Sequence, residues 1–470
     1  MAGARKASAL KGKGGLIMVG ATLILGIWLI IDFRTPESRA PDALPHISEY
    51  THLRSPDVQR VELRRGASVF TLARRGGKWA FEQPKPYRAN SAEIDKWLKS
   101  LLEEATIAQE VAGKPSDMSQ FGLDKPVAEL VLTRGGETRT LQLGSDFKAP
   151  GSTAAATGFY AREVKDGRLF LIASLQADDL KKKKLEDFRD KRLLDFEDDK
   201  AVQRVVITRA ADTLEVARSK DAWAIKQPFP APAEKFDVES LITSVRTAEA
   251  DAFADDAATD LAKYALDKPA LKVELTLNNG RQVLLFGGTA PNNRVYAVRE
   301  GEREVVMVAS TTFDTLNKKP ADLRERKLIT LEQEKIRSIE LKTSSGTLRL
   351  QKVSGDKWQY ADGPNAPFTE AKAESVRTIL SSALAPAHRH VQEAPTDWKV
   401  YGLDTPEITV TLSDGVGSAQ TLMVGKKSAG EQYYARGVPN AAFEVQRFVH
   451  DDLNVKADFF KPAAGGEKSK

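Results

Sequence analysis

The sequence predicts an α+β protein in which an N-terminal transmembrane helix is followed by three tandem strand-rich repeat domains, each with one main helix. Two observations predict this organisation. A cassette of a tryptophan, a proline, a Leu-Asp-x-Pro turn and a tyrosine-bearing strand occurs three times, with about 45 residues from tryptophan to aspartate in every copy. An apolar run from Leu16 to Ile31 precedes the copies. Because the cassette recurs about every 140 residues, each copy is long enough to form a domain.

The N-terminal run has the features of a membrane anchor. Residues 15–33 are apolar except for Asp32, and the preceding basic tail, residues 1–14, is predicted to stay cytoplasmic by the positive-inside rule. Everything after Asp32 is then exported. A cleaved signal peptide is the competing interpretation. Because Pro41 directly follows the small residues of Ser38-Arg39-Ala40 and disfavours cleavage there, we expect an uncleaved anchor.

The segment after the anchor is rich in proline and scattered charge, which is typical of a tether rather than a core. The copies and the recurring motifs then set the domain boundaries. The predicted divisions are a tether at 34–56, repeat domain 1 at 57–196, repeat domain 2 at 197–331, repeat domain 3 at 332–461 and a disordered tail at 462–470.

In copy one, short strand-like runs are separated by glycine-containing turns. Asn90-Ser91-Ala92-Glu93 then provides a helix start, and the apolar residues that follow it lie on one helical face. Alternating strands come after the Leu-Asp-x-Pro turn, and a short basic helix closes the copy. The predicted strands are 58–63, 68–73, 79–83, 128–133, 139–143, 160–162 and 169–172, with the closing helix at 178–190.

Copies two and three repeat this plan. Their main helices are predicted around Val238–Val245 and Val376–Ala383, and a basic closing helix is predicted near residues 314–326 in copy two but not in copy three. The expected strands are 202–207, 214–217, 223–227, 296–299 and 305–308 in copy two, and 336–341, 347–351, 358–360, 408–412, 420–424, 433–436 and 443–445 in copy three.

This order of signals resembles the bacterial domain of unknown function 4340 family. The anchor, W-x3-Q-P, the acidic helix start, G-L-D-x-P and the Y-A-R strand carry the resemblance, which covers nearly all of residues 57–461. The family's activity is undefined, and the resemblance implies a setting beside gliding-type ABC transporter subunits. Ala265 departs from the glycine of the turn. Such drift between copies favours a scaffold over three active sites.

Composition excludes several classes of function. The chain has no cysteine, so disulfides, thiolate nucleophiles and cysteine metal sites are excluded. Its net charge of +5 is dispersed over 470 residues, and no nucleic-acid partner is expected. We find no nucleotide fingerprint, Ser-His-Asp signature or metal-ligand cluster, so no catalytic residue, cofactor or metal site is predicted.

The recurring residues are interpreted as structural. The aspartates Asp124, Asp267 and Asp404 are expected to form turns, because a carboxylate beside an x-Pro step bonds nearby backbone N–H groups. The tryptophans are expected to anchor the cores rather than to stack on ligands. The full set of predicted structural residues is Trp79, Pro84, Asp124, Pro126, Trp223, Pro228, Asp267, Pro269, Trp358, Pro364, Asp404 and Pro406.

Three other motifs are assigned to the surface. The pair His388 and His390 lacks a third ligand and is expected in a solvated loop. Residues 425–428, Gly-Lys-Lys-Ser, are expected to form a hairpin turn, because Gln420 stands where a phosphate loop requires glycine. The run Lys181–Lys184 is expected on a solvated helix face, where an alternative is contact with anionic lipid or an acidic partner.

Together these features predict a single-pass protein of the bacterial cytoplasmic (inner) membrane, with most of the chain on the periplasmic or outer side. The expected function is non-catalytic binding or scaffolding of envelope proteins, with the lipid bilayer contacted through residues 15–33, as an accessory of a gliding-type ABC transporter system. The alternatives are an enzyme that acts on envelope polymers at an interdomain site and a purely structural spacer. The sequence leaves the partner, the oligomeric state and the interdomain geometry open.

Overall fold

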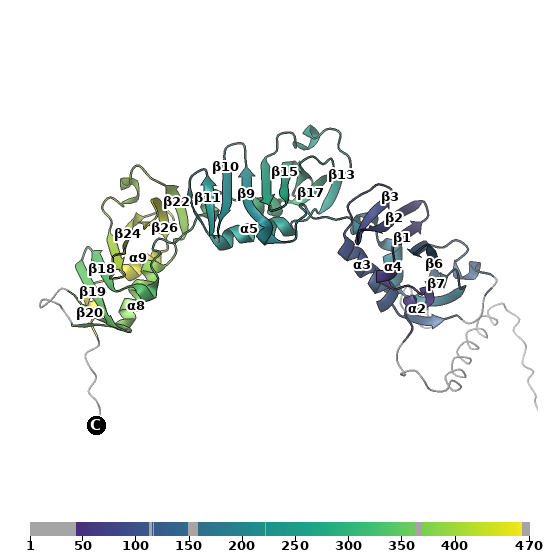
Figure 1. Cartoon of the computed structure of the whole chain (residues 1–470), viewed down its shortest axis with the longest axis horizontal. Helices are drawn as coiled ribbons and strands as arrows, with labels where there is room; N and C mark the ends of the chain where they lie inside the picture. Colours follow the sequence, from purple (N-terminus) through teal and green to yellow (C-terminus); the bar gives the residue numbers. More distant parts are fainter. Residues whose placement is uncertain are drawn as a thin grey trace, which may run out of the picture. The chain divides into compact units, whose positions relative to one another are not determined.

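The computed structural model describes residues 44–111, 115, 117–148, 158–220, 222–361 and 369–462. The predicted tail 1–14, the anchor 15–33, the first part of the tether and Pro364 lie outside these residues. The chain divides into two compact units at Asp190 and Lys191. The first unit holds copy one, and the second holds copies two and three, each copy being built around its own antiparallel sheet (Figure 1).

Copy one contains an eight-stranded antiparallel sheet with the strand order β3-β2-β1-β5-β6-β7-β8-β4. Its strands are β1 (Arg60–Arg65), β2 (Ser68–Arg75), β3 (Lys78–Gln83), β4 (Ile107–Glu110), β5 (Ala128–Arg134), β6 (Glu137–Phe147), β7 (Gly158–Glu163) and β8 (Arg168–Ala173). Its helices are α2 (Ile47–Thr51), η1 (Ser55–Asp57), α3 (Ser91–Lys99), η2 (Ser100–Glu104), η3 (Ser119–Phe121), α4 (Ser174–Lys182) and η4 (Leu185–Phe188).

Copy two contains a nine-stranded sheet with the order β12-β11-β10-β9-β14-β15-β16-β17-β13. Its strands are β9 (Val202–Thr208), β10 (Thr213–Ser219), β11 (Ala222–Gln227), β12 (Ala231–Ala233), β13 (Ala252–Asp255), β14 (Leu271–Leu277), β15 (Gly280–Ala290), β16 (Arg294–Arg299) and β17 (Val305–Ala309). Its helices are η5 (Asp199–Ala201), α5 (Lys235–Thr247), η6 (Ala262–Tyr264), α6 (Ser310–Leu316) and α7 (Pro320–Leu323).

Copy three repeats that sheet in the order β21-β20-β19-β18-β23-β24-β25-β26-β22. Its strands are β18 (Ser338–Thr343), β19 (Gly346–Ser354), β20 (Lys357–Tyr360), β21 (Glu370–Ala371), β22 (Arg389–Glu393), β23 (Ile408–Ser413), β24 (Ala419–Lys427), β25 (Tyr433–Arg436) and β26 (Ala441–Val445). Its helices are η7 (Gln333–Lys335), α8 (Ala373–Leu384), η9 (Lys399–Tyr401), α9 (Arg447–Leu453) and η10 (Ala457–Phe460).

The two faces of each sheet differ, as the alternating sequences require. Val61 and Leu63 of β1 are buried in the core, whereas Glu62 between them lies on the other face and pairs with Arg60 and Arg64. In copy two, Glu274 of β14 pairs with Arg204 and Arg281 of the two neighbouring strands, and in copy three Glu340 of β18 pairs with Lys342 of its own strand and Arg349 of β19. The main helix contributes its apolar stripe to the core, as α5 does in copy two (Figure 1).

The predicted tether differs from the structure at residues 44–56. Helix α2 lies within this segment, and Ile47, Tyr50 and Leu53 are buried in the first core. Their three-residue spacing puts the three side chains on one side of a short helical turn, so they pack against the sheet despite the flanking prolines. This segment therefore belongs to repeat domain 1.

The domain boundaries also lie several residues earlier than predicted. Leu193, Leu194 and Phe196 pack into the second core, and Leu328 and Ile329 pack into the third. The prediction missed the edge strands β4, β13 and β22, which are short and partly polar. It also missed helix α9, which closes copy three with mixed rather than basic charge.

Short linkers between copies are fully hydrogen-bonded to the domains beside them. In the second unit, the Glu325 N–H donates to the Pro232 carbonyl of copy two, while the Arg326 carbonyl accepts from Ala387 of copy three. The first linker has the same bonds within each unit: the Asp190 N–H donates to the Arg88 carbonyl, and the Lys191 carbonyl accepts from Ala250. Glu325 and Arg326 are adjacent, so the chain passes from one copy to the next without an intervening residue.

Candidate functional site

The three recurring tryptophans lie in the cores, on strands β3, β11 and β20. Trp79, Trp223 and Trp358 are 3%, 3% and 4% exposed. A basic side chain lies over each ring, with distances to the ring centroid of 4.7 Å for Arg74, 4.7 Å for Arg218 and 5.9 Å for Lys352. The rings are therefore covered on both sides and present no free stacking face to a ligand.

The prolines of the motifs lie at the ends of strands. Pro84 and Pro228 follow β3 and β11 directly, each after a cis peptide bond. Pro126, Pro269 and Pro406 lie two residues before β5, β14 and β23. Both sets lie between secondary-structure elements, where a proline removes no hydrogen bond between strands of the sheet.

The Leu-Asp-x-Pro aspartates differ from the prediction. Asp124, Asp267 and Asp404 are exposed, and their carboxylates accept no hydrogen bond from any other described residue. An aspartate seven residues earlier makes the local bond instead. The Asp117, Asp260 and Asp397 carboxylates each accept the backbone N–H two residues on, at 2.9 Å in every copy. The recurring Asp at these positions in the printed sequence could have revealed this turn.

A recurring glycine on the strand facing that turn was also missed. A Cβ atom on Gly144, Gly287 or Gly425 would lie 2.1, 2.1 or 2.4 Å from a backbone carbonyl oxygen of the turn. These oxygens belong to Phe121, Tyr264 and Tyr401. Only glycine allows this approach, so the turn and the strand form one packed unit in each copy.

Only His390 of the histidine pair differs from the predicted solvated loop. His388 is exposed, but His390 on β22 is buried between Phe229 and Phe443, and its burial lowers its pKa. The buried Arg324 guanidinium of copy two lies 3.2 Å from the Glu393 carboxylate beside it. His390 therefore belongs to the contact between copies two and three.

The two remaining motifs, residues 425–428 and the lysine run, have structural roles. The hairpin predicted at residues 425–428 lies slightly later, because Gly425 to Lys427 end strand β24 and the turn to β25 begins at Ser428. In the lysine run, Lys182 pairs with Asp178 and Lys183 with Glu93, so the run is not a free basic face. Among the described residues, no group of histidine and acidic side chains could hold a metal ion.

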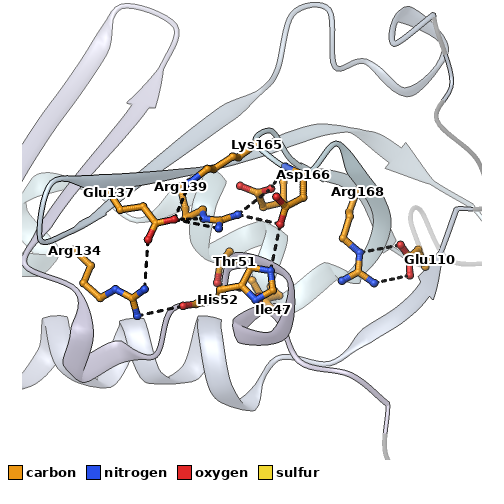
Figure 2. A network of polar contacts seen from close by, with 11 residues as sticks. Ile47, Thr51, His52, Glu110, Arg134, Glu137, Arg139, Lys165, Asp166 and Arg168 are labelled. Atoms are coloured by element: carbon orange, nitrogen blue, oxygen red, sulfur yellow. Dashed lines mark hydrogen bonds and ion pairs between the residues drawn. The ribbon is translucent and has the colours of Figure 1, made fainter.

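A dense ionic network fixes the N-terminal segment of copy one to its sheet (Figure 2). At its centre the buried Arg139 guanidinium lies 2.9 Å from Asp166, 3.1 Å from Glu137 and 3.8 Å from the fully buried Glu163. His52, just after α2, reaches Asp166 at 3.2 Å. Hydrogen bonding and charge from Lys165, together with Arg139, lower the pKa of Glu137 to about 2.

A second contact in the network involves Tyr50 of α2. Its hydroxyl donates to Glu110 at 2.9 Å, and the Arg168 guanidinium lies 3.7 Å from its ring centroid. Burial and the Glu110 carboxylate raise the pKa of Tyr50 to about 12. Hydrogen bonding from Arg168 lowers the pKa of Glu110. Each charge has a partner, so the network stabilises the docked segment.

The strand position of Arg139 has a similar structural role in every copy. Gln282 on β15 bonds both the N–H and the carbonyl of Asp195, and Gln420 on β24 accepts the Thr330 N–H. In all three copies this strand position therefore lies against the N-terminal segment of its own domain.

A groove of about 780 Å³ opens beside α4 in copy one. The ammonium of Lys181 lies over the ring of Phe159, 4.0 Å from its centroid. The groove is lined by Val127, Gly144, Ser145, Asp146, Phe159, Ser174, Asp178 and Lys181.

The fourth residue of the closing helix differs between the copies. It is Ala177 in α4, but Phe313 in α6 and His450 in α9. In copy three, the His450 ring stacks on Tyr433 at 3.8 Å, and its two nitrogens lie 3.3 Å from Glu407 and 3.1 Å from Asp451. In copy one, Ala177 carries no ring, and the Lys181 ammonium lies over the aromatic ring of Phe159 instead.

One carboxylate pair stands out in copy two. Burial, followed by hydrogen bonding and charge from Glu325, raises the pKa of Glu234, which lies at the N-cap position of α5. Arg326 beside them pairs with Asp237 at 3.1 Å. Such a pair is a feature that acid/base sites share with structural networks.

The described residues include no helix that is long and apolar enough to cross a membrane. The predicted anchor at 15–33 lies outside them.

Comparison with known proteins adds one finding. A model of the domain of unknown function (DUF4340) matches residues 79–229, 223–388 and 358–463. Each match begins at the tryptophan of one copy, and the first runs on past the tryptophan of the next. No curated protein matches the chain. Because the three matches together cover most of the chain and follow the three structural copies, the chain belongs to the DUF4340 family, of which it carries three tandem copies.

Proposed function

We propose that this protein is a non-catalytic, membrane-anchored envelope protein that binds or scaffolds partner proteins through the surfaces of its repeat domains. Residues 15–33 would anchor it in the cytoplasmic membrane and place the three copies on the periplasmic or outer side. The family resemblance adds a setting, as an accessory of a gliding-type ABC transporter system.

The observation that carries the proposal is that residues common to all copies and residues that vary between copies lie in different parts of the fold. Those common to all copies lie in cores, turns and sheet contacts, as Trp79 and Gly144 do in copy one. Surface positions instead differ from copy to copy: the second residue of the closing helix is the exposed Leu175, Thr311 or Phe448. In a scaffold, core and turn residues are expected to stay the same from copy to copy while surface residues vary. Three active sites would instead share reactive side chains.

The buried ionic network supports the same proposal. It attaches the segment nearest the anchor to the first sheet through Tyr50 and His52, beside the buried side chains of Ile47 and Leu53. Domain 1 then follows the anchor after few intervening residues, so it is held close to the membrane. A protein that must present a binding surface at a fixed height benefits from such an attachment.

Topology can be tested by proteolysis of spheroplasts from cells that make the full chain. We expect protease to remove the copies and to leave a membrane-bound fragment that contains residues 15–33. Full protection of the chain would contradict the exported topology. Release of a soluble mature protein would show cleavage in place of anchoring.

Partner binding can be tested by in-cell cross-linking of the anchored chain. The control is a version in which residues 1–33 are replaced by a cleavable signal peptide. We expect membrane proteins of one complex to be recovered with the anchored chain and to be depleted with the released one. Recovery of the same background from both would contradict a scaffolding role at the membrane.

The enzyme alternative has one supporting observation, the carboxylate pair of Glu234 and Glu325. Purified chain can be incubated with envelope polymers, with Glu234→Gln as the variant. A hydrolytic activity that this change abolishes without altering the melting temperature would replace the scaffold proposal.

A further inference from the structure

We propose that the groove beside α4 in copy one binds an arginine side chain of a partner protein. This inference rests on the proposed partner-binding function and names the chemistry that one surface would recognise. Three observations support it: a ring that already carries a cation, a filled counterpart in copy three, and carboxylates on the groove wall.

The first observation is the occupant of the ring face. Lys181 places its ammonium 4.0 Å from the centroid of Phe159, which is the geometry of a cation–π contact. No carboxylate of another described residue lies within ion-pair distance of that ammonium. A long, flexible side chain held only by a ring can be displaced by a better cation.

The second observation is the equivalent position in copy three. There the planar His450 ring stacks on Tyr433, the counterpart of Phe159, with an interplanar angle of 4°. Its nitrogens face Glu407 and Asp451. The fold thus provides a slot for a planar nitrogen-bearing group above this aromatic residue, and copy three fills it from its own helix.

The third observation is charge. Asp178, which pairs with Lys182 at 2.8 Å, is the counterpart of Asp451, and Asp146 on β6 is exposed and makes no ion pair with another described residue. A guanidinium is planar, stacks on aromatic rings and binds carboxylates through two parallel N–H bonds. Among side chains, arginine therefore fits a ring flanked by carboxylates better than lysine or a neutral group.

The test uses the full chain in detergent micelles and saturation-transfer NMR with three short peptides. These are acetyl-Gly-Arg-Gly-amide, its citrulline analogue, which has nearly the same shape without charge, and its glutamate analogue. We expect binding of the arginine peptide, and about tenfold weaker binding of the citrulline peptide, since the cation–π and ionic contacts are lost.

Two variants locate the site. Ala177→His introduces the ring that copy three carries, and Asp178→Asn removes a carboxylate from an exposed position; each should weaken arginine binding about tenfold. Thr311→His, which adds the same ring at an exposed position of α6, should leave binding unchanged. Asp178→Asn keeps the test valid if Ala177→His lowers the melting temperature.

The outcomes separate this inference from the proposed function. Equal binding of the arginine and citrulline peptides, tighter binding of the glutamate peptide through Lys181, or unchanged binding by both variants would each overturn the arginine site. The in-cell cross-linking result is independent of these peptides. A failed groove test together with anchored partner capture would therefore move the binding surface elsewhere on the copies.

Discussion

The contact between the recurring turn and the strand glycine can be tested with Gly425→Ala in copy three. A Cβ at this position would lie 2.4 Å from the Tyr401 carbonyl oxygen and 2.8 and 2.9 Å from backbone atoms of Gly402. All three are backbone atoms, so no flexible side chain can yield, and the turn must move away from β24. Overpacking of this kind costs about 1–3 kcal/mol. Movement of the turn would also expose Leu403, which is 4% exposed.

The matched control is Gly430→Ala in the same copy, where an added Cβ would have no heavy atom within 4 Å. Hydrogen exchange of the peptide around Trp398 to Leu403 reports the turn directly, because Leu403 N–H donates to the Trp398 carbonyl. We expect faster exchange there and a lower melting temperature for Gly425→Ala only. If the two variants exchange at the same rate, the close approach does not hold the turn, and the reasoning fails.

Other changes follow from the same structure. Trp223→Ala should destabilise copy two by about 3–5 kcal/mol, seen in chemical denaturation, while copy one keeps its own transition. Asp404→Asn should change stability by no more than about 0.5 kcal/mol, because the carboxylate is exposed and unbonded, whereas Asp397→Asn should lower the melting temperature more. Burial lowers the pKa of His390, which faces Arg324 and Glu393, from its ordinary value of 6.5. Below that pH the unfolded state therefore binds more protons than the folded state. The stability that neutral His390 contributes is lost as the pH falls below that value. His390→Gln should flatten the melting temperature between pH 7 and pH 5, and an equally steep profile in the variant would contradict this.

The repeated frame could be predicted because its signals are strong and local. Val61 and Leu63 alternate with charged residues, Asn90 caps α3 by accepting the Glu93 N–H at 3.1 Å, and each tryptophan marks the same strand. Because the pattern occurs three times, each copy strengthens the structural interpretation of the other two. The family prediction is confirmed for the same reason.

What the sequence could not show depends on contacts between distant segments. Ile47 packs on a sheet whose strands come later, so its proline-rich surroundings suggested a tether. The role of Gly144 depends on a turn about 20 residues earlier that passes over it. The groove is lined by residues of β6, β7 and α4, which are far apart in the sequence and meet only in the folded domain.

The linker bonds imply that a single backbone donor joins each of the first two copies to the linker that follows it. These donors are the N–H groups of Asp190 and Glu325. Copy three has Pro462 at this position, after Phe460, whose carbonyl still accepts the Lys372 N–H as its counterparts do. Proline has no N–H to donate. The edge of copy three therefore lacks the bond that the other two copies make there, and an acidic residue in place of Pro462 would supply the missing donor.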